Sequence, residues 1–373
     1  MNGLKHNFTS EDVRFMKHSL ALAEKGLGFV NPNPLVGAVI VKDGRIIGEG
    51  YHECFGEAHA EINAIRNCRE SLEGSTIYVT LEPCSHFGKT PPCSLAIIEN
   101  KFKKVVIAMS DPNPLVAGRG IAMMQEKGIE VFCGLLEQEA KKINEVFIKY
   151  ITNKKPFVAL KTAMSLDGKI AAHTGDSKWI SNEISRNFVH ELRNRYAGIM
   201  VGADTVIADD PSLTCRVVGQ ETRNPVRIVV DSTLRMPENS QILNVTDART
   251  VIAVTERADK KKVNSFRERG VEILEVKAIS GKVDLEDLMI HLGEMNIDGI
   301  LLEGGGTLNF SALQSGIVDK VYSFIAPKFI GGIHAKTPVE GLGVEKVSNA
   351  FELDQIQCEQ MDNDILITGY IRQ

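Results

Sequence analysis

A histidine, a glutamate and two cysteines in the first quarter of the chain constrain its fold more than any other feature. His59 and Glu61 stand two residues apart in the segment HAE, which opens a predicted helix at residues 58–68. Cys84 follows a short predicted strand, and eight residues separate it from Cys93. One imidazole and two thiolates form a ligand set for Zn²⁺ that leaves a fourth position open for water. The sequence therefore predicts a fold that brings these segments together around one zinc ion.

Glu61 favours a catalytic zinc site over a structural one. Zinc makes hydroxide available near neutral pH, and a carboxylate two residues from a ligand can take the proton and pass it to departing ammonia. The order H-x-E followed by P-C is typical of nucleobase deaminases, although their cysteines stand two residues apart rather than eight. A structural site with His86 as fourth ligand, or buried cysteines without a metal, are the alternatives, and both leave Glu61 unexplained.

The composition is that of a two-domain globular enzyme. A chain of 373 residues exceeds what one hydrophobic core usually serves, and 43% apolar with 24% charged residues is ordinary for such proteins. The net charge of −5 and the lack of a long basic run argue against nucleic acid as a partner. No apolar stretch approaches the roughly 18 residues that span a bilayer, and residues 1–10 lack a signal-peptide pattern, so we expect a cytoplasmic protein without membrane contact.

The seven cysteines do not indicate a disulfide framework, because their number is odd and they are spread over a long chain. Five lie outside the predicted zinc site and are expected to be small core residues: Cys54, Cys68, Cys133, Cys215 and Cys358.

Short apolar runs alternate with helical patterns along the chain, which indicates α/β architecture. The first part predicts a helix from residue 9 to about 24, a hairpin at Asp43-Gly44, strands at 76–81, 104–109 and 129–132, and helices at 92–101 and 138–150. A polar stretch ending in Pro156 marks a boundary. Further strands are predicted at 157–163, 198–201, 227–231, 250–254, 271–274, 299–302, 320–326 and 365–371. We therefore expect two α/β domains, residues 1–153 and 154–373.

Longer motifs in both halves resemble the bifunctional deaminase–reductase family of riboflavin biosynthesis. The first half carries PCSHFGKTPPC at residues 83–93, NPLVGAV at 33–39 and DPNPLVAGRG at 111–120. The second half carries KTAMSLDGKIA at 161–171, GDSKWI at 175–180 and ADDPSLT at 208–214. The resemblance covers nearly the whole chain in order. The long cysteine segment is specific, whereas the short glycine-rich pieces alone are not.

The resemblance implies a cytidine-deaminase-like α/β/α domain followed by a dihydrofolate-reductase-like α/β domain. It also implies two consecutive reactions. The first hydrolyses the ring amino group of 2,5-diamino-6-ribosylamino-4(3H)-pyrimidinone 5′-phosphate, and the second reduces the ribosyl group to ribityl with NADPH. The expected cofactors are Zn²⁺ and NADPH. The expected partners are a phosphorylated pyrimidine substrate and further copies of the chain in a homo-oligomer of a size that the sequence leaves open.

In the first domain, the resemblance assigns zinc binding to His59, Cys84 and Cys93 and proton transfer to Glu61. The expected substrate contacts are Asn33, His86, Lys89 and Thr90. Asn33 matches the residue that holds the pyrimidine, and Lys89 suits a phosphate as a point charge. A solvated loop lysine is the alternative for Lys89. Val30 is a departure, because some relatives carry threonine there.

In the second domain, the first strand is not followed by a G-x-G-x-x-G segment, so the Rossmann interpretation fails. Residues 303–308, EGGGTL, suit phosphate because glycine lets backbone N–H groups approach an anion at a helix start. A tight turn is the alternative. The resemblance places the cofactor at Ala163, Trp179, Thr205, Asp209, Ser232, Gly304, Gly305, Gly306, Thr307 and Leu308. It places the substrate at Ser177, Arg193, Leu213, Arg216 and Glu303.

Several of these residues have simpler explanations. Two arginines suit a phosphorylated substrate because guanidinium binds phosphate bidentately, but either could form a surface salt bridge. Trp179 could pack in the core, and Asp209 or Glu303 could cap a helix.

Two other functions remain open at this level. One is deamination of a tRNA base or a free nucleoside, and the pI near 6.0 argues against tRNA. The other is a regulatory protein with a structural zinc and a nucleotide-sensing domain, and Glu61 beside His59 argues against it.

Overall fold

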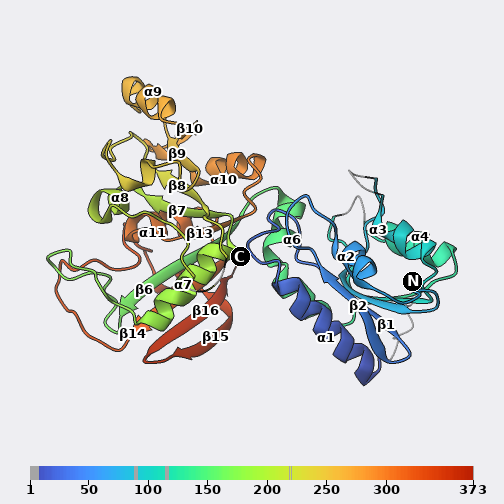
Figure 1. The fold of residues 1–373 in the computed structure, drawn as a ribbon. Coiled ribbons are helices and arrows are strands. Elements are labelled where there is room, and N and C mark those ends of the chain that lie inside the picture. The colour runs from blue at the N-terminus through green and yellow to red at the C-terminus, as the bar shows by residue number, and fades with distance from the viewer. Residues whose placement is uncertain (1–7, 88–90, 114–116, 218, 220, 373) are drawn as a thin grey trace. The chain divides into compact units, whose positions relative to one another are not determined.

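Two compact units make up the chain, Met1–Asn153 and Lys154–Gln373. The computed structural model describes residues 8–87, 91–113, 117–217, 219 and 221–372. Each unit has its own β-sheet flanked by helices, so both are α/β as predicted (Figure 1).

The first unit is built on a five-stranded sheet in the order β2-β1-β3-β4-β5. Its elements are α1 (Ser10–Glu24), β1 (Gly37–Lys42), β2 (Arg45–Tyr51), α2 (Ala60–Asn67), β3 (Thr76–Leu81), α3 (Cys93–Glu99), β4 (Lys104–Met109), α4 (Arg119–Glu126), β5 (Glu130–Cys133), α5 (Glu137–Ile143) and α6 (Glu145–Asn153). β1 pairs antiparallel with β2 and β3, whereas β3, β4 and β5 are parallel. Asp43 and Gly44 form the predicted hairpin turn with φ of 49° and 74°.

Helices cover both faces of this sheet. Gly37 of β1 faces α1, since a Cβ there would collide with the backbone at Ser19. Gly50 pairs with Ala38, the next residue along β1, and faces the backbone of α2 at Ala64. Neighbouring residues of a strand point to opposite faces, so α1 and α2 lie on opposite sides. The missing side chains let both helices pack closely against the sheet.

Local signals placed most of these elements correctly. Thr9 and Asp12 form a capping box at the start of α1, and β3 and β4 have the predicted bounds. The prediction of one helix at residues 138–150 is wrong, because Asn144 separates α5 from α6. The Asn144 side chain accepts the Leu35 N–H at 2.8 Å and donates to the Leu35 carbonyl at 3.0 Å. The helix is interrupted at the residue that makes these hydrogen bonds, so two shorter helices stand where one was predicted.

The second unit contains a nine-stranded sheet in the order β10-β9-β8-β7-β13-β6-β14-β16-β15. Its elements are β6 (Phe157–Ser165), α7 (Glu183–Arg195), β7 (Gly198–Gly202), α8 (Ala203–Asp209), β8 (Val226–Val230), η1 (Gln241–Leu243), β9 (Thr250–Val254), α9 (Lys260–Glu268), β10 (Glu272–Glu275), β11 (Ala278–Ile279), β12 (Lys282–Val283), α10 (Leu285–Glu294), β13 (Gly299–Leu302), α11 (Gly306–Gln314), β14 (Lys320–Ala326), η2 (Val347–Asn349), β15 (Leu353–Met361) and β16 (Asp364–Ile371). The first seven strands of this sheet, in the order β10-β9-β8-β7-β13-β6-β14, pair in parallel, and β16 and β15 are antiparallel. β11 and β12 pair antiparallel in a separate two-stranded sheet.

Apolar side chains fill both sides of this sheet. One cluster joins the strands to α10 and α11, and a second joins them to α8 and α9. The sequence did not predict β15, since it lacks an apolar face and most of its side chains are exposed. Hydrogen bonding to β16 makes it a strand.

The prediction that five cysteines are core residues is wrong for Cys54, Cys133 and Cys358, which are exposed. Cys215 is buried and Cys68 is intermediate. Helices that are both long and apolar enough to cross a bilayer do not occur among the described residues.

Candidate active sites

The three predicted zinc ligands converge at the C-terminal end of β3 in the first unit. His59 Nδ1 lies 3.6 Å from Cys84 Sγ and 3.3 Å from Cys93 Sγ, and all three ligand atoms lie within 4.8 Å of one another. Ligand atoms around a tetrahedral zinc ion stand roughly 3.5–3.8 Å apart, given bond lengths of about 2.0–2.3 Å. The donor set and its spacing therefore fit Zn²⁺.

The first turn of α3 holds the two cysteines together. The Cys93 N–H donates to Cys84 Sγ at 3.2 Å, and the Ser94 N–H and hydroxyl donate to the Cys84 carbonyl at 3.2 and 3.0 Å. Hydrogen bonds from Cys93 and His59 lower the pKa of the Cys84 thiol. A thiolate is the form that a metal binds, so this arrangement prepares Cys84 as a ligand.

Glu61 lies in the first turn of α2, two residues after the helix cap His59. Its side chain is 3% exposed and contacts the Cys93 thiol. Burial and the negative charge of Cys84 raise the pKa of Glu61 to about 7, and the charge of His59 opposes that shift. The carboxylate is therefore buried within the ligand cluster rather than solvated.

A cavity of about 310 Å³ opens beside the ligand cluster. The predicted residues among its lining are Asn33, His59, Glu61, Cys84 and His86. Lys89 and Thr90 fall outside the described residues. The structure thus gathers every predicted deaminase residue that it describes around one cavity or its metal ligands.

Two buried residues that sequence reasoning missed shape this cavity. His52 hydrogen-bonds the Ala58 carbonyl through Nδ1 at 3.1 Å and Asn33 Nδ2 through Nε2 at 3.1 Å, which orients the Asn33 amide. Glu82 accepts backbone N–H groups from Asp111, Gly118, Gly120 and Ile121 at 3.0–3.4 Å. Glu82 stands in the EPC segment, two residues before Cys84, and that proximity was the only available signal.

In the second unit, a cavity of about 250 Å³ lies at the C-terminal ends of β6, β7 and β13. Ligands commonly bind at this edge of parallel sheets. The predicted residues that line it are Ala163, Arg193, Thr205, Asp209, Leu213, Glu303 and Gly304.

A larger cavity of about 460 Å³ adjoins the first. Its predicted lining residues are Ala163, Ser177, Trp179, Arg193, Arg216 and Glu303. The two cavities share Lys161, Ala163, Ile170, Arg193 and Glu303. Trp179 is 64% exposed, and the Arg186 guanidinium lies over its ring at 4.7 Å, so Trp179 is not a core residue. It lines the cavity that also holds Ser177 and Arg216.

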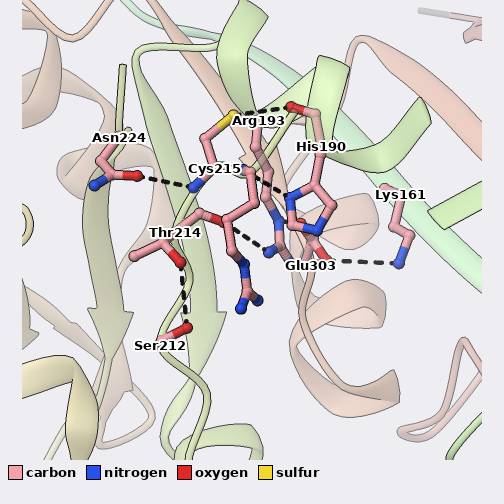
Figure 2. A network of polar contacts seen from close by, with 9 residues as sticks. Lys161, His190, Arg193, Ser212, Thr214, Cys215, Asn224 and Glu303 are labelled. Atoms are coloured by element: carbon pink, nitrogen blue, oxygen red, sulfur yellow. Dashed lines mark hydrogen bonds and ion pairs between the residues drawn. The ribbon is translucent and has the colours of Figure 1, made fainter. Parts of the chain in front are cut away.

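A largely buried ion pair marks the boundary of the two cavities. Arg193 donates to Glu303 from Nε at 2.7 Å and from Nη2 at 3.0 Å, and Lys161 Nζ lies 3.5 Å from the same carboxylate (Figure 2). Burial by itself would raise the pKa of Glu303, but the charges of Arg193 and Lys161 lower it to about 2. Lys161 begins the KTAMSLDGKIA motif, yet only its contact with Glu303 indicates a place in the site.

Five expected cofactor residues do not line either of these cavities: Ser232, Gly305, Gly306, Thr307 and Leu308. Gly305 caps α11, and a Cβ there would lie 3.5 Å from Thr205 Oγ1, so this glycine stands next to the smaller cavity. A Cβ on Gly306 would collide with Thr337 and Glu340 instead. Ser232 accepts the Val283 N–H at 3.0 Å.

Both units match models of known protein families. Residues 9–109 match the cytidine and deoxycytidylate deaminase zinc-binding region, and residues 156–367 match the RibD C-terminal domain. The fold and the zinc site therefore define a zinc-dependent deaminase joined to a reductase.

Full-length relatives have the same organisation. The chain is 51% identical to the riboflavin biosynthesis protein RibD of Actinobacillus pleuropneumoniae, over 96% of this chain and 95% of that protein. A solved RibD structure from Acinetobacter baumannii is 36% identical, with a TM-score of 0.88 over 97% of this chain and 99% of that one. The chain belongs to the RibD family of riboflavin biosynthesis.

Another solved structure is named for both activities. It is a diaminohydroxyphosphoribosylaminopyrimidine deaminase/5-amino-6-(5-phosphoribosylamino)uracil reductase from Thermotoga maritima, 42% identical with a TM-score of 0.85, covering 97% of this chain and 99% of that one. Family membership confirms the predicted fold class, the two enzyme classes, and Zn²⁺ and NADPH as cofactors.

Proposed function

We propose that residues 1–153 deaminate a diaminohydroxyphosphoribosylaminopyrimidine and that residues 154–373 then reduce the ribosyl group of the product to ribityl. His59, Cys84 and Cys93 hold the zinc ion in this proposal. Zinc supplies a hydroxide nucleophile near neutral pH when it is bound. The convergence of these three side chains beside a cavity that also contains Glu61 is the observation that carries the assignment.

Glu61 moves the protons of the deamination. Its carboxylate is buried between the ligand cluster and the cavity, so it lies within reach of both a water molecule and the departing amino group. Proton transfer by a positioned group requires such a geometry first. The carboxylate takes a proton from water and delivers it to the nitrogen that leaves as ammonia.

Asn33 and His86 orient the pyrimidine, together with Lys89 and Thr90. The hydrogen bond between Asn33 Nδ2 and His52 engages the amide nitrogen, and in this proposal the carbonyl oxygen accepts from a ring amino group. His86 lines the same cavity as Cys84. Lys89 is the candidate for the phosphate, as a positive charge in the segment between the two cysteines.

The shared wall of the two cavities in the second unit supports the reductase assignment. NADPH supplies a hydride, and the protein must hold the donor and acceptor carbons in contact. Ala163, Thr205, Asp209 and Gly304 line the cofactor side. The cavity fits the nicotinamide end of the cofactor, because it lies at the strand ends beside the glycine segment that precedes α11.

The larger cavity receives the ribosyl phosphate. Ser177, Arg193, Arg216 and Glu303 line it, and the two guanidinium groups provide donors for a phosphate or for sugar hydroxyls. Leu213 contributes an apolar surface from the cofactor side. Trp179 covers the cofactor from the larger cavity, and Ser232 and residues 305–308 hold its distal part in this proposal.

We also propose that the chain acts as a homo-oligomer in the cytoplasm. β15 is a nine-residue edge strand whose side chains are mostly exposed, with Ile356 58% exposed. Unpaired edge strands of this length are usually covered. A reducing compartment keeps Cys84 and Cys93 as metal-binding thiols. Light scattering coupled to size exclusion tests the assembly, since a mass of 41.0 kDa would mean a monomer.

A coupled assay tests the two activities together. Zinc-loaded protein receives the diaminopyrimidinone ribosyl phosphate and NADPH, and ammonia release and NADPH absorbance are followed at once. Ammonia release followed by NADPH oxidation that depends on it is the expected result. Ammonia without NADPH oxidation would refute the assignment of the second unit. If the protein holds one zinc per chain and gives neither ammonia nor NADPH oxidation, the assigned substrate would be refuted.

A further inference from the structure

Residues 212–216 form an irregular segment that contributes to both cavities of the second unit. Leu213 lines the smaller cavity and Arg216 lines the larger one. Leu213 has a φ of 50°, a left-handed backbone conformation that non-glycine residues rarely adopt. A segment without regular secondary structure needs side-chain contacts to hold such a shape.

Helix α7 supplies those contacts through His190 and Arg193, one helical turn apart. The Arg216 N–H donates to His190 Nδ1 at 3.2 Å, and the Cys215 thiol donates to the His190 carbonyl at 3.2 Å. Arg193 Nη1 donates to the Thr214 carbonyl at 3.1 Å (Figure 2). Three successive residues of the segment are therefore bound to two residues of the helix.

The hydrogen bond to Nδ1 determines the state of the imidazole ring. Nδ1 accepts a hydrogen bond from the Arg216 N–H, so it carries no proton itself, and the neutral ring has its proton on Nε2. Burial and the charges of Arg193, Arg216 and Lys161 lower the pKa of His190 to about 4, and Glu303 opposes them. A neutral ring packs beside these cations without repelling them.

We propose that His190 is a positioning residue of the reductase: its neutral imidazole anchors the backbone of Arg216 to α7 and so holds Arg216 at the wall of the substrate cavity. The inference rests on the proposed function, in which Arg216 contacts the substrate. His190 itself lines the same cavity but acts through the backbone of Arg216. Arg216 is exposed, so without this anchor its backbone would be less ordered in the free enzyme. Substrate binding would then have to order it, and the entropy lost would weaken the affinity for the substrate.

Four variants test this role: His190→Ala, His190→Asn, His190→Gln and Arg216→Ala, with the double variant of His190→Ala and Arg216→Ala. Asparagine places an oxygen near the position of Nδ1, whereas glutamine places its amide near the position of Nε2. The readouts are kcat and the KM values for the deaminated substrate and for NADPH. Ammonia release by the first unit of the same chain reports on the integrity of each preparation.

Three results are expected. His190→Ala raises the substrate KM about 5- to 30-fold and changes kcat and the KM for NADPH by less than about 3-fold, the scale of one lost hydrogen bond. His190→Asn restores most of the substrate KM, and His190→Gln does not. The double variant resembles Arg216→Ala alone, because His190 acts through Arg216.

Other results would overturn the inference in distinguishable ways. An unchanged substrate KM in His190→Ala, with a raised one in Arg216→Ala, would refute only the role of His190. Additive effects in the double variant, or rescue by glutamine instead of asparagine, would mean direct contact with the substrate. An unchanged substrate KM in Arg216→Ala would refute the proposed substrate role of Arg216 and, with it, this inference. If His190→Ala does not fold, the substrate KM of His190→Asn compared with that of His190→Gln decides whether an acceptor at the position of Nδ1 is required.

Discussion

Arg193 and Glu303 form a bidentate ion pair across 110 positions of sequence, at 2.7 and 3.0 Å, where the two cavities of the second unit meet. One donor atom of the same guanidinium also binds the Thr214 carbonyl. A single arginine thus joins the strand end that carries Glu303, helix α7 and the segment that carries Arg216. This geometry suits a substrate site that must keep a fixed position relative to a cofactor site.

Replacing Arg193 should affect the reductase substrate more than NADPH. We expect Arg193→Ala to raise the substrate KM about 10- to 100-fold, the scale of losing hydrogen bonds to a charged group, and to raise the KM for NADPH less. Steady-state kinetics on the deaminated substrate measure both. Arg195→Ala, on the same helix, is the control. A larger effect on NADPH would assign Arg193 to the cofactor.

Glu61→Gln should retain zinc and lose ammonia release by about 100-fold or more, because the amide cannot transfer the protons. Zinc content is measured by atomic absorption and ammonia by a coupled dehydrogenase assay. Glu57→Gln, an exposed position shortly before the site, should leave both unchanged. Full activity in Glu61→Gln would contradict its role.

Cys84→Ala should release zinc and abolish deamination while NADPH-dependent reduction of the deaminated substrate continues. The reason is that the two units have separate cores. Cys133→Ala removes an exposed thiol of the same unit and should keep one zinc per chain. Loss of both activities in Cys84→Ala would show that the units depend on each other.

Asp12 should make the first unit sensitive to acid. It is buried at the start of α1 and accepts hydrogen bonds from Tyr78 at 2.8 Å and from Lys104 at 3.0 Å. Burial opposes ionisation, but the hydrogen bonds from Thr9, Tyr78 and Lys104 outweigh it and lower the pKa below the usual 3.8. The unfolded chain therefore binds the proton first, so this stabilisation is present above about pH 4 and is lost as the pH falls.

The matching experiment compares urea unfolding of Asp12→Asn with that of the natural chain between pH 7 and pH 3. We expect a loss of about 1–3 kcal/mol at pH 7 that shrinks towards acid pH. Glu11→Gln, an exposed neighbour on the same helix, is the control. A difference that grows as the pH falls would contradict the sign of this effect.

Much of the fold followed from short-range signals. The capping box at Thr9, the Asp43-Gly44 turn, and the apolar runs that became β3, β4, β9, β13 and β14 are decided by residues adjacent in sequence. The zinc set could be predicted because its chemistry demands particular residue types at constrained spacings. The motifs of both halves identified the family, and the family implied the two activities.

Tertiary structure decided the remainder. Asn144 divides a helix because it meets Leu35, 109 positions away, and β15 is a strand only because β16 lies beside it. Lys161 lies in a sequence motif and His190 lies in none, but neither partner follows from the sequence, because their contacts with Glu303 and Arg216 span 142 and 26 positions. The sequence alone determined the local elements and the chemistry of the zinc ligands. Which side chains far apart in the sequence come into contact depends on how strands and helices pack. Local propensities describe only neighbouring residues, so they do not predict these contacts.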